Sequence, residues 1–292
     1  MQTDENKLTT ADIFVPNQLL QFLGIQADEA AFSDMLKKQI ECNAVVLQVG
    51  IDKGEEVLHS TNAAATFSLV NELFELAVPA VRRFNGMIDC FLENGFQALF
   101  TKSREDGVRA AIQIRENILQ RKYIYEDRVT VGLAYGPVSV GVIGFEDRVS
   151  PITMSMHTSI ARFLQKKAGE YHAHILLTGT LLESISDYAT LYGHRPLGLF
   201  YRESEKKEER IYDLFDGDAP AARQTKRKTK QLFEKGMHVF LERDFVKARG
   251  FFIEVLKADR SDTAARKYLS LCDGFLLAPP SESIRSLCLE RM

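Results

Sequence analysis

The sequence predicts a mixed α/β (α+β) domain followed by a small all-α C-terminal helical extension. Three observations support this fold class. The run at 44–51 is almost continuously apolar, as in a strand buried on both faces of a sheet. Two short apolar runs at 84–100 are separated by a turn and flanked by amphipathic segments. Beyond residue 223, apolar residues recur with helical spacing. The 292 residues are enough for one large domain with a smaller one.

The segment 84–100 is the clearest local signal. Its two apolar runs, 87–92 and 96–100, are short enough to be strands and are joined by Glu-Asn-Gly at 93–95. Asn and Gly tolerate positive φ, so these residues suit a tight turn. We therefore expect a β-hairpin with a carboxylate and an amide at its tip.

A helix is predicted on each side of this hairpin, because apolar residues recur with a period near 3.6 in 67–83 and in 106–120. The order helix, hairpin, helix resembles the catalytic core of the class III nucleotidyl cyclases, the adenylate and guanylate cyclases. That resemblance implies a ferredoxin-like βαββαβ cyclase homology domain, which we place at residues 41–217. It also implies a dimeric site in which one subunit supplies two aspartates for two divalent cations.

The positions that carry the chemistry in this family are changed here. By the resemblance, the metal-binding aspartate of the hairpin falls on Asn94 and the aspartate that ends the first strand falls on Gly50. The base-selecting lysine falls on Cys90. Hard divalent cations prefer anionic oxygen, which neither asparagine nor glycine provides. We therefore predict no catalytic residue and no metal site, with Mg²⁺ or Mn²⁺ as cofactor only if the chain is a divergent enzyme.

Three carboxylates remain near these positions as candidate residual groove residues. Asp52 lies two residues after Gly50, so it shares a face of the strand but lies farther from the hairpin tip. It is either a surviving ligand or a solvated strand-end carboxylate. Asp89 belongs to the first arm of the hairpin, and Glu93 is next to Asn94 with its side chain expected on the opposite face.

The segment 150–168 is similar to the strand and helix that carry the family's base-selecting aspartate and its Asn–Arg pair. In one register these three residues are Met156, Ser159 and Phe163. Moving by one residue retains Arg162 but puts Thr158 in place of the asparagine. Neither register restores the pair, so Arg162 is either a relic of the site or a solvent-facing helix residue.

A second segment, 131–148, repeats the family's glycines at Gly136, Gly141 and Gly144, after a strand expected at 128–134 and closed at 135–137. A structural arm at a dimer interface is the favoured interpretation over a phosphate cradle.

The last part of the predicted domain also resembles the cyclase family. Strands are expected at 189–192 and 197–201, and 210–215 resembles the family's last strand. The triphosphate-binding lysine falls within 203–205, with two lysines directly after it, Lys206 and Lys207. His172 and His174 lack a further residue at metal-ligand spacing.

The ends of the chain differ in character. Residues 1–40 form a segment before the domain that includes a short helix at 18–23, and 279–292 is expected to be mobile. The tail at 223–278 resembles a tetratricopeptide repeat, and one and a half such repeats must pack on the domain or on a partner. Its basic run at 223–230 has no aromatic residues among it, which favours a charged helical turn over nucleic-acid binding.

Composition indicates an ordinary soluble protein. The formal net charge of −3 and 26% charged residues give no overall attraction to nucleic acid or to an anionic membrane. Four scattered cysteines fit a reduced compartment. No apolar run approaches the roughly 20 residues of a membrane span, and the N-terminus lacks a signal peptide. We expect a cytoplasmic protein.

The sequence therefore predicts a catalytically degenerate adenylate or guanylate cyclase-like protein, a pseudoenzyme that acts in signalling through association. The expected partners are a second copy, another cyclase-type domain, and a protein bound by the tail. One alternative is a divergent active cyclase that makes cAMP or cGMP from ATP or GTP. A further alternative is a nucleotide-binding sensor without turnover.

Overall fold

The computed structural model describes residues 21–24, 39–52, 63–145, 148–202 and 206–280. The predictions for 1–20, 25–38, 203–205 and 281–292 lie outside these ranges.

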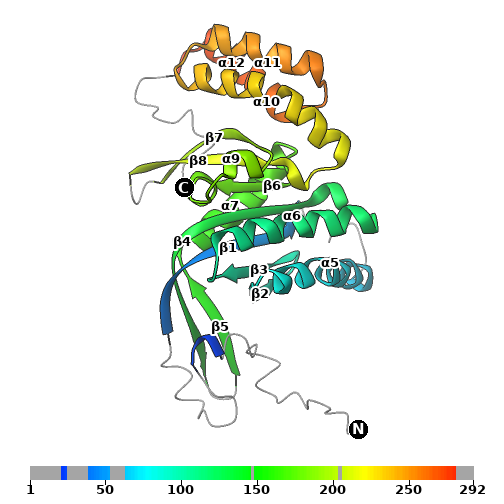
Figure 1. The fold of residues 1–292 in the computed structure, drawn as a ribbon, viewed down its shortest axis with the longest axis vertical. Coiled ribbons are helices and arrows are strands. Elements are labelled where there is room, and N and C mark those ends of the chain that lie inside the picture. The colour runs from blue at the N-terminus through cyan, green and yellow to red at the C-terminus, as the bar shows by residue number, and fades with distance from the viewer. Residues whose placement is uncertain (1–20, 25–38, 53–62, 146–147, 203–205, 281–292) are drawn as a thin grey trace.

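One mixed sheet organises the chain (Figure 1), with the strand order β2-β3-β1-β4-β6-β8-β7 and β5 paired to the far end of β4. Its eight described strands are β1 (Gln39–Ile51), β2 (Met87–Leu92), β3 (Gly95–Phe100), β4 (Val129–Phe145), β5 (Arg148–Met154), β6 (Ile175–Thr178), β7 (His194–Arg202) and β8 (Lys207–Leu214). The described helices are α5 (Ala63–Arg83), α6 (Arg104–Arg121), α7 (Met156–Glu170), α8 (Gly179–Leu182), α9 (Tyr188–Leu191), α10 (Pro220–Leu241), α11 (Phe245–Ala258) and α12 (Thr263–Leu277), with 3-10 turns η1 (Glu126–Arg128) and η2 (Phe215–Gly217).

The sheet is buried on both faces, which explains the apolar run in β1. Alternate residues of a strand point to opposite faces. Val45 and Leu47 join the core that α5 and α6 cover, whereas Ala44 and Val46 join the core under α7. The predicted α/β fold class is confirmed.

Two local predictions are wrong. The strand expected to close at 135–137 continues as β4 to Phe145, because Pro137 and its neighbours stay paired with β1 in an unbroken register. The strand expected at 189–192 is the short helix α9. Asp187 adopts a left-handed φ of 56°, and its carbonyl accepts the N–H groups of Thr190 and Leu191, which closes a helical turn instead.

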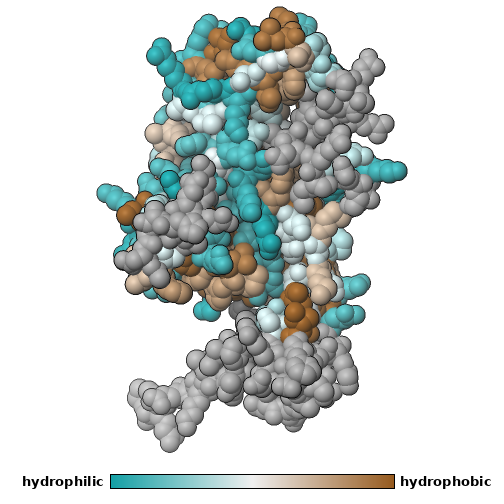
Figure 2. Space-filling model, turned by 180° about the vertical axis from the view of Figure 1, so that it is seen from behind, coloured by the Kyte–Doolittle hydropathy of each residue, from teal (hydrophilic) through white to brown (hydrophobic). Residues whose placement is uncertain are grey.

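The helical tail, α10 to α12, packs against the outer end of the sheet rather than standing free. Phe233 and Met237 of α10 belong to the same core as Leu197 and Phe200 of β7. The tail also exposes apolar side chains, which gather at the top of the view in Figure 2. They include Leu241, Val246, Leu271, Leu276 and Leu277.

One helix among the described residues could cross a membrane by length and composition alone, the stretch Ala64–Arg83 of α5. The expectation that no segment would qualify is therefore not confirmed. Core helices of soluble proteins pass the same test. Leu73, Ala77 and Val81 are fully buried in the core between α5 and the sheet, and 22% of the apolar window is buried.

Candidate functional site

Gly50, at the position of one metal-binding aspartate of the cyclases, faces a side chain from α7. A Cβ added at Gly50 would lie 3.0 Å from Nε2 of Gln165. That glutamine is 4% exposed, and its Nε2 donates to Oγ1 of Thr130 at 2.7 Å. The space in front of residue 50 is thus occupied by a neutral amide that is itself fixed by β4.

Asn94, at the position of the other metal-binding aspartate of the cyclases, connects the hairpin to the end of β1 by hydrogen bonds. Its Nδ2 donates to the carbonyl oxygen of Ile51 at 3.0 Å, and the Ile51 N–H donates to the Asn94 carbonyl at 2.9 Å. The amide thus forms a backbone contact, which an aspartate could not make because a carboxylate has no donor. With one neutral amide and a glycine, these two positions do not fit a divalent cation.

Asp52 directly follows the end of β1 and, like Gly50, faces α7. A Cβ added at Gly169 would clash with the Asp52 carboxylate, which therefore lies over the backbone of the last turn of α7. Gln165 and Gly169 are one helical turn apart in α7, and they meet Gly50 of β1 and Asp52 just after it. The Asp52 carboxylate contacts this helix rather than the hairpin tip.

Asp89 is a buried structural acceptor. It is 6% exposed, and its carboxylate accepts from Gln97 Nε2 at 2.5 Å and from Thr153 Oγ1 at 2.7 Å. Burial raises the pKa of this carboxyl group, although both hydrogen bonds act against the rise. Both oxygens are engaged, so Asp89 connects β2 to β3 and to β5.

Cys90 and Arg162 lie within electrostatic reach of each other. Burial and the charge of Asp89 raise the pKa of the Cys90 thiol to about 11, while the positive charge of Arg162 opposes the rise. The Arg162 side chain is exposed, and so is that of Glu93 at the hairpin tip. The residue in the base-selecting position and the candidate relic arginine therefore border the same surface.

The remaining positions of α7 separate into exposed and packed residues. The ring of Phe163 lies 5.9 Å from that of Phe200, and Met156 packs against the same core. Ser159 is exposed, and Thr158 Oγ1 donates to the Ser155 carbonyl at 2.6 Å. Phe163 is thus a packing residue, and Arg162 is the exposed neighbour that the other register places at the arginine.

Two buried glutamines on this face were not singled out from the sequence. Gln48 and Gln97 are 2% and 3% exposed and face each other across β1 and β3. Their Oε1 atoms have no hydrogen-bond partner among the described residues. The only sequence signal for these buried amides is a polar residue inside the apolar run of β1, and that signal identifies Gln48 but not Gln97.

The other predicted candidates lie elsewhere. His172 is exposed, whereas His174 bonds Asp218 beside the tail. Lys206 and Lys207 are exposed at the start of β8. Within the part of the chain that the structure describes, no group of three or more His, Cys, Asp or Glu side chains could hold a metal ion.

No family model matches the chain. It is 21% identical over 212 residues to the adenylate cyclase, terminal-differentiation specific, of Dictyostelium discoideum, a match that covers 70% of this chain and 10% of that protein. The chain thus spans a tenth of that curated relative.

Solved structures give the fold. A bacterial light-regulated adenylyl cyclase superposes with a TM-score of 0.58 at 15% identity, covering 77% of this chain and 64% of that one. The adenylyl cyclase CyaB from P. aeruginosa superposes with a TM-score of 0.51 at 17% identity, covering 60% of this chain and 95% of that one. The chain therefore has the fold of the class III adenylyl and guanylyl cyclase homology domain.

Proposed function

We propose that the chain is a catalytically degenerate adenylyl or guanylyl cyclase-like protein that acts in cyclic-nucleotide signalling through association. The observation that carries the proposal is the contact between Gly50 and Gln165, since the place of one metal ligand is filled by a neutral side chain from another element. Asn94 supports it, because its amide holds the end of β1.

The energetic consequence is large. Cyclisation of a nucleoside triphosphate depends on two cations that neutralise charge on the attacking and leaving oxygens. Losing even about 4 kcal/mol of transition-state stabilisation lowers the rate roughly a thousandfold. Two positions without a carboxylate are consistent with a loss of at least this size.

Association is proposed through two surfaces. The cyclase-type face would pair with a second copy or with another cyclase-type domain. The tail, which we interpret as related to tetratricopeptide repeats, would bind a cytoplasmic protein partner through the apolar side chains that it exposes.

A nucleotide-binding sensor without turnover is the second candidate. Nucleotide binding does not need the two missing carboxylates, so the residues at positions 50 and 94 do not argue against it. The divergent-enzyme alternative has less support. Asp89 has both oxygens engaged, and the Asp52 carboxylate lies over Gly169.

The test is an assay of the full chain for cyclic AMP and cyclic GMP from ATP and GTP with Mg²⁺ or Mn²⁺. The proposal predicts no product above the blank. Turnover that disappears in Asp89→Ala or Asp52→Ala would refute it and establish a divergent enzyme.

Calorimetry separates the two non-catalytic candidates. Heat on titration with ATP or GTP indicates the sensor. Absence of heat leaves association as the function, which sedimentation of the chain with and without a cyclase-type partner then measures.

A further inference from the structure

A cavity of about 470 Å³ lies between the sheet and the helical tail and shares no lining residue with the groove described above. It is large enough for a small organic molecule. Buried charged side chains form its floor, and exposed polar residues form its rim. The lining comprises Asp127, Tyr171, His172, His174, Arg195, Asp218, Ala219, Ala221, Ala222, Thr225, Lys226, Asp259, Ser261, Asp262 and Thr263.

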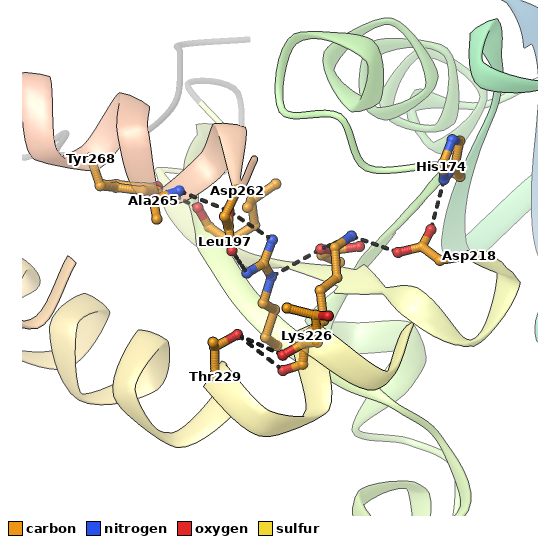
Figure 3. Close-up of polar contacts among 11 residues, drawn as sticks. His174, Leu197, Asp218, Lys226, Thr229, Asp262, Ala265 and Tyr268 are labelled. Atoms are coloured by element: carbon orange, nitrogen blue, oxygen red, sulfur yellow. Dashed lines mark hydrogen bonds and ion pairs between the residues drawn. The ribbon is translucent and has the colours of Figure 1, made fainter. Parts of the chain in front are cut away.

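The cations of the floor are already paired (Figure 3). Nε of Arg195 lies 3.0 Å from Asp213, and its Nη1 lies 2.5 Å from Asp262. Nζ of Lys226 lies 2.9 Å from Asp213 and 2.7 Å from Asp218. The two positive charges are therefore committed to carboxylates of the protein and are not free to bind an anion.

The charge around the cavity is negative. The carboxylates that line it or pair with its floor are Asp127, Asp213, Asp218, Asp259 and Asp262. The cations near them are Arg195, Lys226 and Arg115, which interacts electrostatically with Asp218 and Asp127. Three cations against five carboxylates leave two negative charges. The dipole of α10, whose N-terminus has no side-chain cap, adds about half a positive charge at the cavity, so the net charge there stays negative.

His174 adds a free acceptor. Asp218 Oδ1 lies 2.7 Å from its Nδ1, and the Asp218 side chain is 1% exposed, which places the ring proton on Nδ1. Burial lowers the pKa of His174, so the ring is neutral at pH 7. Its Nε2 has no partner among the described residues and can accept a hydrogen bond in the cavity.

We propose that this cavity binds a small organic cation with primary ammonium groups, held by the rim carboxylates Asp127 and Asp259 and by Nε2 of His174. A metal ion does not fit, because no three ligating side chains converge among the described residues. Carboxylates spread along a rim suit an extended cation instead. Asp127 belongs to η1 of the domain and Asp259 ends α11 of the tail, so the ligand joins the two.

The test is calorimetric titration of the full chain with putrescine, with uncharged butanediol as the matched control. Putrescine is expected to bind and butanediol is not. In Asp127→Asn the dissociation constant should rise roughly fivefold, the loss of about 1 kcal/mol for one exposed charge pair. Glu208→Gln, which removes an exposed carboxylate of β8 that does not line the cavity, should change nothing.

Three outcomes overturn the proposal: no heat with putrescine at millimolar concentration, equal binding of butanediol, or equal weakening in both variants. Asp127 is exposed and its charge acts on the buried Arg115, but no hydrogen bond or ion pair of its side chain is found among the described residues, so Asp127→Asn should leave the protein folded. The cavity is independent of the cyclase-type groove, so the result does not depend on the proposed function.

Discussion

Arg195 on β7 and Asp262 at the N-cap of α12 form a fully buried ion pair between the sheet and the tail, with each side chain 1% exposed. Asp262 also accepts the N–H of Ala265, so one carboxylate both begins the helix and anchors it to the sheet. Asp213 of β8 bonds the other side of the same guanidinium. The sheet and the tail are thus joined by buried charged side chains.

We expect Arg195→Met to destabilise the chain by about 3 to 5 kcal/mol, because it leaves Asp213 and Asp262 short of a buried partner. Urea unfolding measures the change. The control is Arg210→Met, which breaks the exposed pair with Glu183, where the arginine side chain is 65% exposed, and should cost less than about 1 kcal/mol. Equal losses in the two variants would contradict the role given to the buried network.

Stability should fall as the pH drops below neutrality. Burial lowers the pKa values of His174 and His194, so the folded state binds fewer protons than the unfolded state. Their contribution is present in full above the unfolded value of about 6.5 and is lost as pH falls towards the folded values. Each group contributes a slope of at most about 1.4 kcal/mol per pH unit.

His174→Gln should therefore reduce the pH dependence of the unfolding free energy between about pH 7 and 5. His238→Gln is the control, because that side chain is 75% exposed. A slope unchanged by His174→Gln would show that the ring titrates alike in both states.

Gly50→Ala is expected to cost about 1 to 3 kcal/mol, because the new Cβ would lie 3.0 Å from Gln165 Nε2 and displace it from Thr130. In a Gln165→Ala background the same change should cost much less. A double-mutant cycle measured by denaturant unfolding reports the coupling. Additive effects would mean that the two residues do not compete for the same space.

Asn94→Asp should lower stability by about 1 to 2 kcal/mol, since it removes the donor to the Ile51 carbonyl and sets a carboxylate against it. Asn71→Asp, on the exposed face of α5, makes the same chemical change without a buried partner and should be close to neutral. Thermal unfolding at pH 7 compares the two variants. An Asn94→Asp variant as stable as the original chain would contradict the structural role given to the Asn94 amide.

Much of the fold could be predicted because it depends on local patterns. The apolar run of β1 and the turn before Gly95 placed the centre of the sheet and its hairpin. The strand assigned at 189–192 failed because a left-handed residue, Asp187, sets the conformation there, and apolar residues alone do not reveal it.

The contacts around the candidate sites could not be predicted, because they join residues far apart in the chain. Gln165 meets Gly50 across 115 positions (165 − 50), and nothing in either segment indicates the other. Lys226 belongs to the basic run that predicted a charged helical turn, yet it is 8% exposed and pairs with two aspartates. Burial of a single charged residue within a basic run has no signature in composition.

The glutamine over residue 50 also bears on how such a protein can change. A carboxylate introduced at that place alone would meet an occupied space, and shortening the glutamine alone would leave a void and remove the donor to the Thr130 hydroxyl oxygen. Either substitution made alone therefore gives a protein that is less stable than the present one. Only a simultaneous change at positions 50 and 165 avoids this loss of stability, so a stepwise evolutionary return to an ion-binding site is disfavoured.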